Sequence, residues 1–130
     1  MRTLAREIVF KYVFSTLFID SDKELFDVLK SELNDNDKIF ASKLLESIET
    51  NKDRFLTELE CIAVGYKVNR LYNTDKCALL VGMAELVSFP ETDLPIIIDE
   101  AVKLCAKYST ERSTDFVNGI LAKFAKNIGR

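Results

Sequence analysis

The stretch CALLVGMAELV, residues 77–87, decides the fold class of this chain. Apolar side chains stand on nearly every side of it, and Glu85 is its one charged residue. A helix without a polar face is typical of the centre of a helical bundle. Thr74 can cap the start of this helix, and Phe89-Pro90 ends it because the residue before a proline avoids the helical region. The sequence therefore predicts a buried central helix.

Amphipathic segments flank this helix on both sides, with apolar residues at three-and-four spacing. Ser21-Asp22-Lys23-Glu24 is a capping box, whose side chains satisfy backbone N–H groups of a first helical turn. Residues 34–37 and 67–73 are polar and predict loops. The further helices are expected from about Thr3 to Phe18, from the capping box to Leu33, over residues 40–48 and 52–66, from Pro95 to Tyr108, and from a Ser113 cap to Ile128. This pattern predicts an all-α, single-domain bundle of about seven helices over residues 1–130.

Length and composition agree with that fold class. The 130 residues fit one domain, and only 4 glycines and 2 prolines leave little room for the turns of a β-sandwich or barrel. No apolar run reaches the roughly 18 residues needed to span a membrane. Residues 1–7 lack the apolar block and the cleavage site of a signal peptide. We therefore expect a cytoplasmic protein without membrane association.

The residue types argue against catalysis. The sequence has no histidine, which removes Ser–His and Cys–His nucleophilic pairs and nearly every zinc site. Cys61, Cys77 and Cys105 are far apart, and each lies in an apolar helical pattern, so we expect three buried, reduced thiols. No motif indicates carboxylate or lysine chemistry. We expect a protein that is not an enzyme and has no catalytic residue, metal site or cofactor.

Charge is distributed unevenly along the chain, whose net charge is −3. Residues 1–19 hold three basic side chains and one acidic one, and residues 103–130 hold six basic and two acidic ones, whereas the middle is acidic. If the first and last helices pack side by side, they create one positive face that can attract a polyanion. The alternative is that these lysines and arginines only solvate two exposed helices.

Asn118-Gly119 is an unusual pair for the middle of a helix, where together the two residues cost about 1–1.5 kcal/mol relative to alanine. One explanation is structural: Gly119 allows the close approach of another helix, and Asn118 bonds a neighbouring backbone. The other is functional, with Asn118 on the surface beside a ligand. The sequence leaves both open.

The C-terminal part of the chain resembles the NusB family of transcription antitermination factors. Residues 98–108, IDEAVKLCAKY, and residues 113–121, STDFVNGIL, are similar to the family pattern I-N-E-A-x-x-L-A-K followed by S-x-x-F-V-N-G-V-L. Ala5-Arg6-Glu7 at the start of a helix and Glu85-Leu86 at the end of the buried helix also match. The matches extend over almost the whole chain. The resemblance implies a seven-helix bundle of two packed subdomains.

The resemblance also implies a function and partners. The protein would bind the single-stranded boxA element of nascent ribosomal RNA together with the ribosomal protein NusE, and the pair would load onto RNA polymerase and suppress termination. Monomer and homodimer both stay open. The RNA-binding positions expected from the family match and from charge are Arg2, Arg6, Lys11, Lys107, Tyr108, Arg112, Phe116 and Asn118, and the expected partner-binding positions are Asp75 and Lys76.

Several of these residues have a structural alternative. Arg6 could be a solvated helix charge, Tyr108 and Phe116 could close the core, and Asp75 could favour the helix dipole in a first turn. Glu100, inside an apolar pattern, is expected to be a structural hydrogen-bonding group.

The chain also departs from the family pattern. Asp99 replaces the usual Asn, Leu80 stands where the family commonly has Arg, Ala84 stands where it often has Tyr, and the N-terminal arm carries only two arginines. These changes predict modest RNA affinity for the protein alone. Two other classes compete with an antitermination factor: a helical adaptor that has lost RNA binding, and the RNA-binding part of a ribosomal RNA cytosine methyltransferase. The chain carries no glycine-rich cofactor motif, which argues against the second class.

Overall fold

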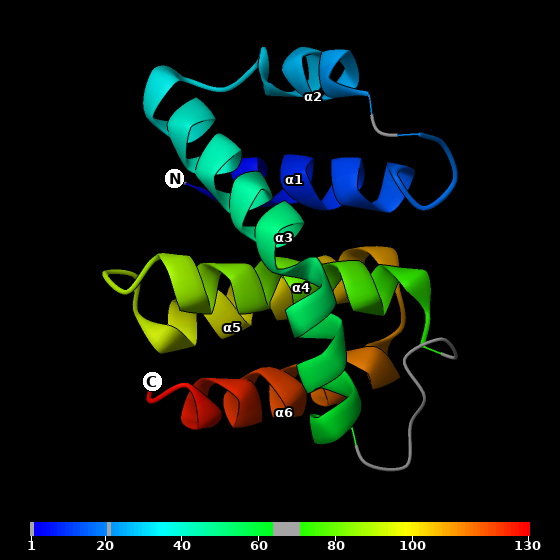
Figure 1. The fold of residues 1–130 in the computed structure, drawn as a ribbon, viewed down its shortest axis with the longest axis vertical. Coiled ribbons are helices and arrows are strands. Elements are labelled where there is room, and N and C mark those ends of the chain that lie inside the picture. The colour runs from blue at the N-terminus through cyan, green and yellow to red at the C-terminus, as the bar shows by residue number, and fades with distance from the viewer. Residues whose placement is uncertain (1, 21, 64–70) are drawn as a thin grey trace.

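A computed structural model describes residues 2–20, 22–63 and 71–130 of the chain. This part consists of helices and connections without strands, as the sequence predicted (Figure 1). The helices are α1 (Thr3–Ser15), α2 (Lys23–Lys30), α3 (Asp35–Ile62), α4 (Asn73–Ser88), α5 (Leu94–Tyr108) and α6 (Glu111–Asn127). None of the helices within these ranges combines the length and the apolar character that crossing a bilayer requires.

The helix α3 joins two segments that the sequence analysis had separated. Helices were expected over residues 40–48 and 52–66, but the chain runs as one helix from Asp35 to Ile62. The residues between them, Glu49-Thr50-Asn51, include neither glycine nor proline, so nothing there breaks the backbone pattern. Asn34 caps this helix, because its side chain accepts a hydrogen bond from the Asp37 N–H. The last residues of the helix predicted over residues 52–66, and residues 67–70 of the predicted loop, lie outside the described residues.

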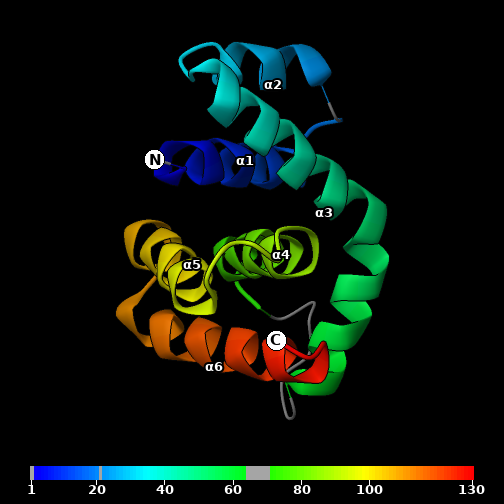
Figure 2. The same ribbon diagram turned by 90° about the vertical axis from the view of Figure 1, so that its left-hand side faces the viewer.

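The long α3 helix spans both halves of the molecule (Figure 1). Its first half packs against α1, and its second half packs beside α4 and α6. Side-chain hydrogen bonds from Lys23 to Glu49 and from Lys30 to Ser42 join α2 to it. Figure 2 shows α4 beside α5, with α1 on one side of this pair and α6 on the other. All residues from Cys77 to Leu86 are buried, which confirms the central buried helix. The two packed subdomains implied by the family resemblance are therefore present.

Close packing around α4 depends on Gly82. A Cβ at this position would lie 2.7 Å from Leu121 Cδ1 on α6 and 3.4 Å from Ala101 Cβ on α5. Gly119 is different, because a Cβ there would meet nothing within 4 Å and the residue is exposed. The structural explanation offered for Gly119, a close approach of another helix, therefore does not apply there, and such an approach occurs at Gly82.

Three local expectations are corrected by the structure. Thr74 does not cap α4, which begins at Asn73 without a side-chain cap. Ser113 does not cap the last helix, because α6 begins two residues earlier and Thr110 accepts the capping bond. Cys61 is exposed, since it lies off the buried stripe of α3.

Cys77 and Cys105 are buried as expected. Burial raises the pKa of each thiol to about 12, with a further contribution from Asp75 at Cys105. Both therefore stay protonated at neutral pH, as structural thiols do.

Candidate nucleic-acid interface

The basic side chains of the two chain ends meet where α1 packs beside α5. The two helices run in the same direction, since Thr3 Oγ1 donates to Glu100 Oε1 at 2.9 Å and Lys107 Nζ donates to Glu7 Oε1 at 2.7 Å. We call this line of contact the α1–α5 seam, formed by Thr3, Glu7 and Lys11 of α1 with Glu100, Lys103, Lys107 and Tyr108 of α5. It brings together residues about 100 positions apart in the chain.

Glu7 is the centre of the seam. Its Oε1 accepts from Lys107 Nζ and from the Tyr108 hydroxyl, and Lys11 Nζ lies 3.7 Å from the same oxygen. The hydrogen bond from Lys107, followed by that from Tyr108, lowers the pKa of Glu7 below its ordinary value of 4.5. Glu7 in turn raises the pKa of Lys107. At neutral pH the seam therefore holds an ionised carboxylate under fixed basic groups.

Three ammonium groups point from the seam into solvent. The side chains of Lys11, Lys103 and Lys107 are 49%, 70% and 59% exposed, although each lies within 4 Å of a glutamate oxygen. Lys103 stands 3.9 Å from Glu100. An ammonium group has three N–H donors, so each exposed amine can keep its glutamate partner and still donate to a phosphate. Contacts of this kind position a nucleic-acid backbone.

Aromatic rings continue the seam at its far end. The Tyr108 ring stacks on Phe10 with 5.0 Å between centroids, and the Lys107 ammonium lies 5.4 Å from the Tyr108 centroid. Along α1, Phe14 contacts Phe10 and Phe18, and Phe18 is 65% exposed. Aromatic side chains beside lysines are typical of surfaces that bind single-stranded nucleic acid.

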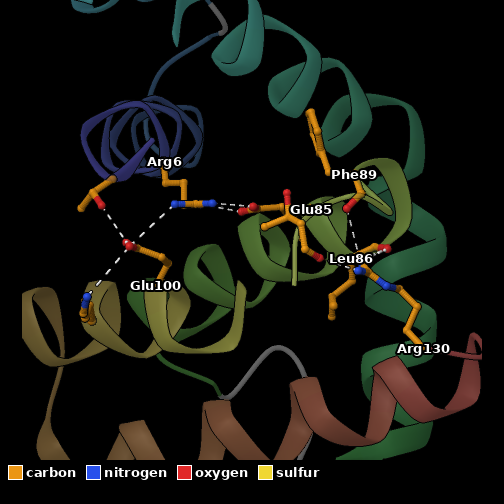
Figure 3. A network of polar contacts seen from close by, with 9 residues as sticks. Arg6, Glu85, Leu86, Phe89, Glu100 and Arg130 are labelled. Atoms are coloured by element: carbon orange, nitrogen blue, oxygen red, sulfur yellow. Dashed lines mark hydrogen bonds and ion pairs between the residues drawn. The ribbon is translucent and has the colours of Figure 1, made fainter. Parts of the chain in front are cut away.

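Arg6 lies below the seam rather than on it. Its Nε and Nη2 donate to the two carboxylate oxygens of Glu85, both at 2.6 Å, and its Nη1 lies 3.7 Å from Glu100. Figure 3 shows the guanidinium between the carboxylates of Glu85 and Glu100. Arg6 is only 4% exposed. A direct contact with RNA would require Arg6 to leave Glu85, so in this structure Arg6 positions helices.

Glu100 serves the same network, as the sequence analysis expected of it. It accepts from Thr3 and stands near both Arg6 and Lys103.

Arg2 lies at the opposite end of α1. Its guanidinium stacks 4.4 Å from the centre of the Phe40 ring and 5.8 Å from that of Phe89. It forms no hydrogen bond or ion pair with the described side chains, and it borders an open groove together with Lys43 and Glu91. Arg2 is therefore accessible at the start of α1 but separate from Lys107.

Asp75 connects three helices inside the molecule. Its carboxylate accepts from Ser113 Oγ of α6 at 2.8 Å and from Cys105 Sγ of α5 at 3.3 Å, and the residue is 4% exposed. The neighbouring Lys76 is half-buried. Asp75 also lines a groove together with Tyr72. Because Asp75 is buried, its carboxylate does not protrude from the surface, and a partner would contact the groove instead.

The remaining predicted residues lie along α6. Arg112 is exposed, and together with the half-buried Phe116 it lines the same groove as Asp75. Asn118 is exposed on the face of α6 that points away from the core. Asn118 therefore lies on the surface, as its functional explanation requires. No hydrogen bond or ion pair joins it to another described site residue.

The two terminal helices are not neighbours, which corrects the expected origin of the basic face. Figure 2 shows α4 and α5 between α1 and α6. The seam instead joins α1 to residues 100–108 of α5, and it includes Lys103, which was not among the predicted site residues. Arg112 lies beyond α5, in the first turn of α6. Of the predicted basic residues, Lys11 and Lys107 meet on the seam, whereas Arg6 is buried beneath it and Arg2 and Arg112 lie away from it.

Sequence reasoning missed Glu7 and Arg130. Apart from the Ala-Arg-Glu match, nothing in the sequence indicated a role for Glu7, because its three partners come together only in the folded chain. Arg130 donates to the carbonyl oxygens of Leu86, Phe89, Pro90 and Thr92, which closes the end of α4 (Figure 3). An arginine beyond the last apolar residue of a helix carries no sequence signal for such a contact.

These features define an all-helical bundle of two packed halves, with exposed amines and aromatic rings along one helix–helix seam. The family model of the NusB family matches residues 1–126. The chain therefore belongs to the NusB family, a non-enzymatic family of transcription antitermination factors.

Similar proteins agree with this assignment. The transcription antitermination protein NusB of Carboxydothermus hydrogenoformans is 33% identical, over 98% of this chain and 94% of that protein. The corresponding protein of Natranaerobius thermophilus is 27% identical, over 99% and 97%. The solved structure of T. maritima NusB superposes with a TM-score of 0.90 at 26% identity, covering 97% of this chain and 91% of that chain. A structure described as antitermination factors NusB and NusE in complex with dsRNA gives a TM-score of 0.86 at 25% identity, covering 97% and 96%.

Proposed function

We propose that this protein binds boxA-type single-stranded RNA in nascent ribosomal RNA transcripts together with NusE, and that the pair joins RNA polymerase to suppress termination. The proposal that the protein binds RNA rests on the α1–α5 seam, where three exposed lysines flank stacked aromatic rings. The solved relative in complex with NusE and dsRNA supports a surface of this family meeting both kinds of partner. Antitermination is the family's activity.

Electrostatics sets the expected strength of binding. Each phosphate neutralised on a single strand contributes about −0.7 to the slope of log affinity against log salt, so three lysines predict a slope of about −2. The seam is only weakly positive, because Arg6 and the three lysines face the carboxylates of Glu7, Glu85 and Glu100. We therefore expect weak RNA binding by the protein alone.

The aromatic rings at the end of the seam are the reason to propose single-stranded rather than double-stranded RNA as the ligand. Exposed bases stack on aromatic side chains, each stack contributing about 1–3 kcal/mol, whereas a duplex keeps its bases stacked on one another. Phe18 and the half-buried Tyr108 are available at the end of the seam. Arg112, Phe116 and Asn118 would extend the path of the strand along α6, and Arg2 would contact it at the start of α1.

NusE is proposed to complete the site. The groove lined by Tyr72, Asp75 and Phe116 lies next to the α5–α6 corner, and Lys76 stands beside it, so a protein docked there would reach an RNA strand that passes Arg112. This arrangement explains why the partner would tighten RNA binding rather than compete with it.

A titration tests the proposal. Fluorescently labelled boxA-type RNA, a scrambled strand and a duplex of the same sequence are titrated at two salt concentrations, each with and without NusE. The proposal expects preference for the boxA-type strand and a lower dissociation constant with NusE. Equal dissociation constants with and without NusE would contradict it. NusE binding without any RNA binding would instead support a helical adaptor.

A further inference from the structure

Glu7 is an acid at the centre of a surface proposed to bind a polyanion. Its Oε1 receives the Lys107 ammonium at 2.7 Å and the Tyr108 hydroxyl, with Lys11 Nζ 3.7 Å away. Repulsion alone would disfavour a carboxylate at this place. Its side chain is 15% exposed, so it lies under these groups rather than in front of them.

The contacts fix groups that would otherwise move. A lysine side chain loses up to about 2 kcal/mol of rotamer entropy when it is held in one geometry. The bond to Glu7 imposes this ordering on Lys107 before any ligand arrives. Tyr108 is held at both ends, because its hydroxyl donates to Glu7 and its ring stacks 5.0 Å from Phe10. Pre-ordered contact groups improve binding by removing an ordering cost at the moment of association.

We propose that Glu7 is the positioning residue of the RNA surface: through one carboxylate oxygen it holds Lys107 and Tyr108 in the geometry that discriminates between RNA sequences. The inference rests on the proposed function and adds a determinant of specificity to it. Glu7 itself does not contact RNA. It reduces the net charge of the seam, which lowers affinity for any polyanion, and in exchange it orders the two groups that distinguish one strand from another.

Two variants of Glu7 separate its charge from its anchoring role. Glu7→Ala removes both the charge and the acceptor. Glu7→Gln removes the charge but keeps a side-chain oxygen that can accept from Lys107 and Tyr108. Asp99→Ala is the matched control, because it changes the net charge of the protein by the same amount as Glu7→Ala. Asp99 is exposed and has no hydrogen bond or ion pair to described side chains.

The experiment measures dissociation constants for boxA-type and scrambled single strands, with NusE present. Glu7→Ala is expected to reduce the preference for the boxA-type strand about tenfold, the loss of roughly one ordered base contact. Its affinity for the scrambled strand should rise or stay unchanged. Glu7→Gln should keep most of the preference, and Asp99→Ala all of it. Combining Glu7→Ala with Tyr108→Phe should add little, because both remove the same bond.

Each other result has a defined meaning. If the wild type prefers boxA-type RNA and Glu7→Ala keeps that preference, the positioning role is overturned while the proposed function stands. A loss as large in Glu7→Gln as in Glu7→Ala also overturns it, because the acceptor oxygen would then not matter. If the wild type binds no RNA even with NusE, the proposed function fails and the inference fails with it.

Discussion

Arg6 and Glu85, 79 positions apart in the chain, form a two-pronged buried ion pair that joins α1 to the central helix α4, with both N–O distances at 2.6 Å. Their side chains are 5% and 1% exposed. Glu85 without Arg6 would lack a counter-ion away from water, and Arg6 without Glu85 would keep only Glu100, 3.7 Å from its Nη1. The pair therefore fixes how the first helix sits on the core, and the α1–α5 seam depends on that placement.

Removing one partner of this pair should strongly destabilise the protein. Arg6→Ala leaves Glu85 buried without its counter-ion, and we expect a loss of about 3–5 kcal/mol in the free energy of unfolding, measured in urea. Replacing both residues by apolar ones, Arg6→Met with Glu85→Leu, should cost clearly less. Arg54→Ala is the control, since its exposed pair with Glu58 should contribute under about 1 kcal/mol. Equal losses for Arg6→Ala and Arg54→Ala would refute the structural role.

Arg130 should stabilise the end of α4. Its guanidinium donates to four carbonyl oxygens between Leu86 and Thr92, of which the shortest bond is 2.6 Å to Thr92. Bonds from a charged donor typically contribute about 1.5–3 kcal/mol each, less where the site is solvated. We expect Arg130→Ala to lower the free energy of unfolding by about 1–3 kcal/mol. Lys126→Ala, which removes an exposed charge from the last turn of α6, should change it by less than about 0.5 kcal/mol.

Replacing Gly119 and Gly82 by alanine should change the stability of the protein in opposite directions. Gly119→Ala places a methyl group in open space on an exposed helix, so the better helix propensity should stabilise by about 0.5–1 kcal/mol. Gly82→Ala brings a methyl group 2.7 Å from Leu121 Cδ1 in a fully buried site, where overpacking costs about 1–3 kcal/mol and outweighs the propensity gain. Thermal unfolding of the two variants is sufficient to compare them. A stabilising Gly82→Ala would show that α6 can move away from α4.

The seam should weaken in acid. Because Lys107 and Tyr108 lower the pKa of Glu7, the stabilisation is fully present above its ordinary value of 4.5 and is lost as the pH falls through the lowered pKa. The difference in unfolding free energy between wild type and Glu7→Gln should be constant from neutral pH to about pH 5 and then shrink. A difference that persists unchanged at about pH 3 would mean that the ionised carboxylate does not stabilise the seam.

Much of the fold could be predicted from local signals. The uninterrupted apolar stretch from Cys77 to Leu86 fixed α4 as the central helix, and Pro95 and Tyr108 bounded α5 correctly. The division of α3 was an error, because a change in its apolar stripe near Asn51 resembled a boundary although no breaking residue stands there. The Ser113 cap failed for a similar reason: Thr110, three residues earlier, accepts the first-turn bond instead.

The candidate site was harder to predict, since it depends on which helices are neighbours. The concentration of basic residues near both ends of the sequence predicted that they share a face. Lys11 and Lys107 do lie together, because both contact Glu7. Position could not reveal that Arg6 turns inward, because the partners that bury it, Glu85 and Glu100, come from α4 and α5. Asp75 likewise turned out to bond Ser113 and Cys105, two residues to which no local pattern connects it.

The central claim is that RNA lies along the line where α1 meets α5, and mapping the contact on the isotope-labelled protein tests it most directly. Backbone amide chemical shifts are followed while a boxA-type single strand is added in the presence of NusE, with NusE alone as the reference. The account predicts RNA-dependent shifts concentrated in residues 7–18 and 103–108. Shifts confined to α2 and the start of α3, around the exposed Val28 and Ile39, with residues 103–108 unaffected, would contradict it.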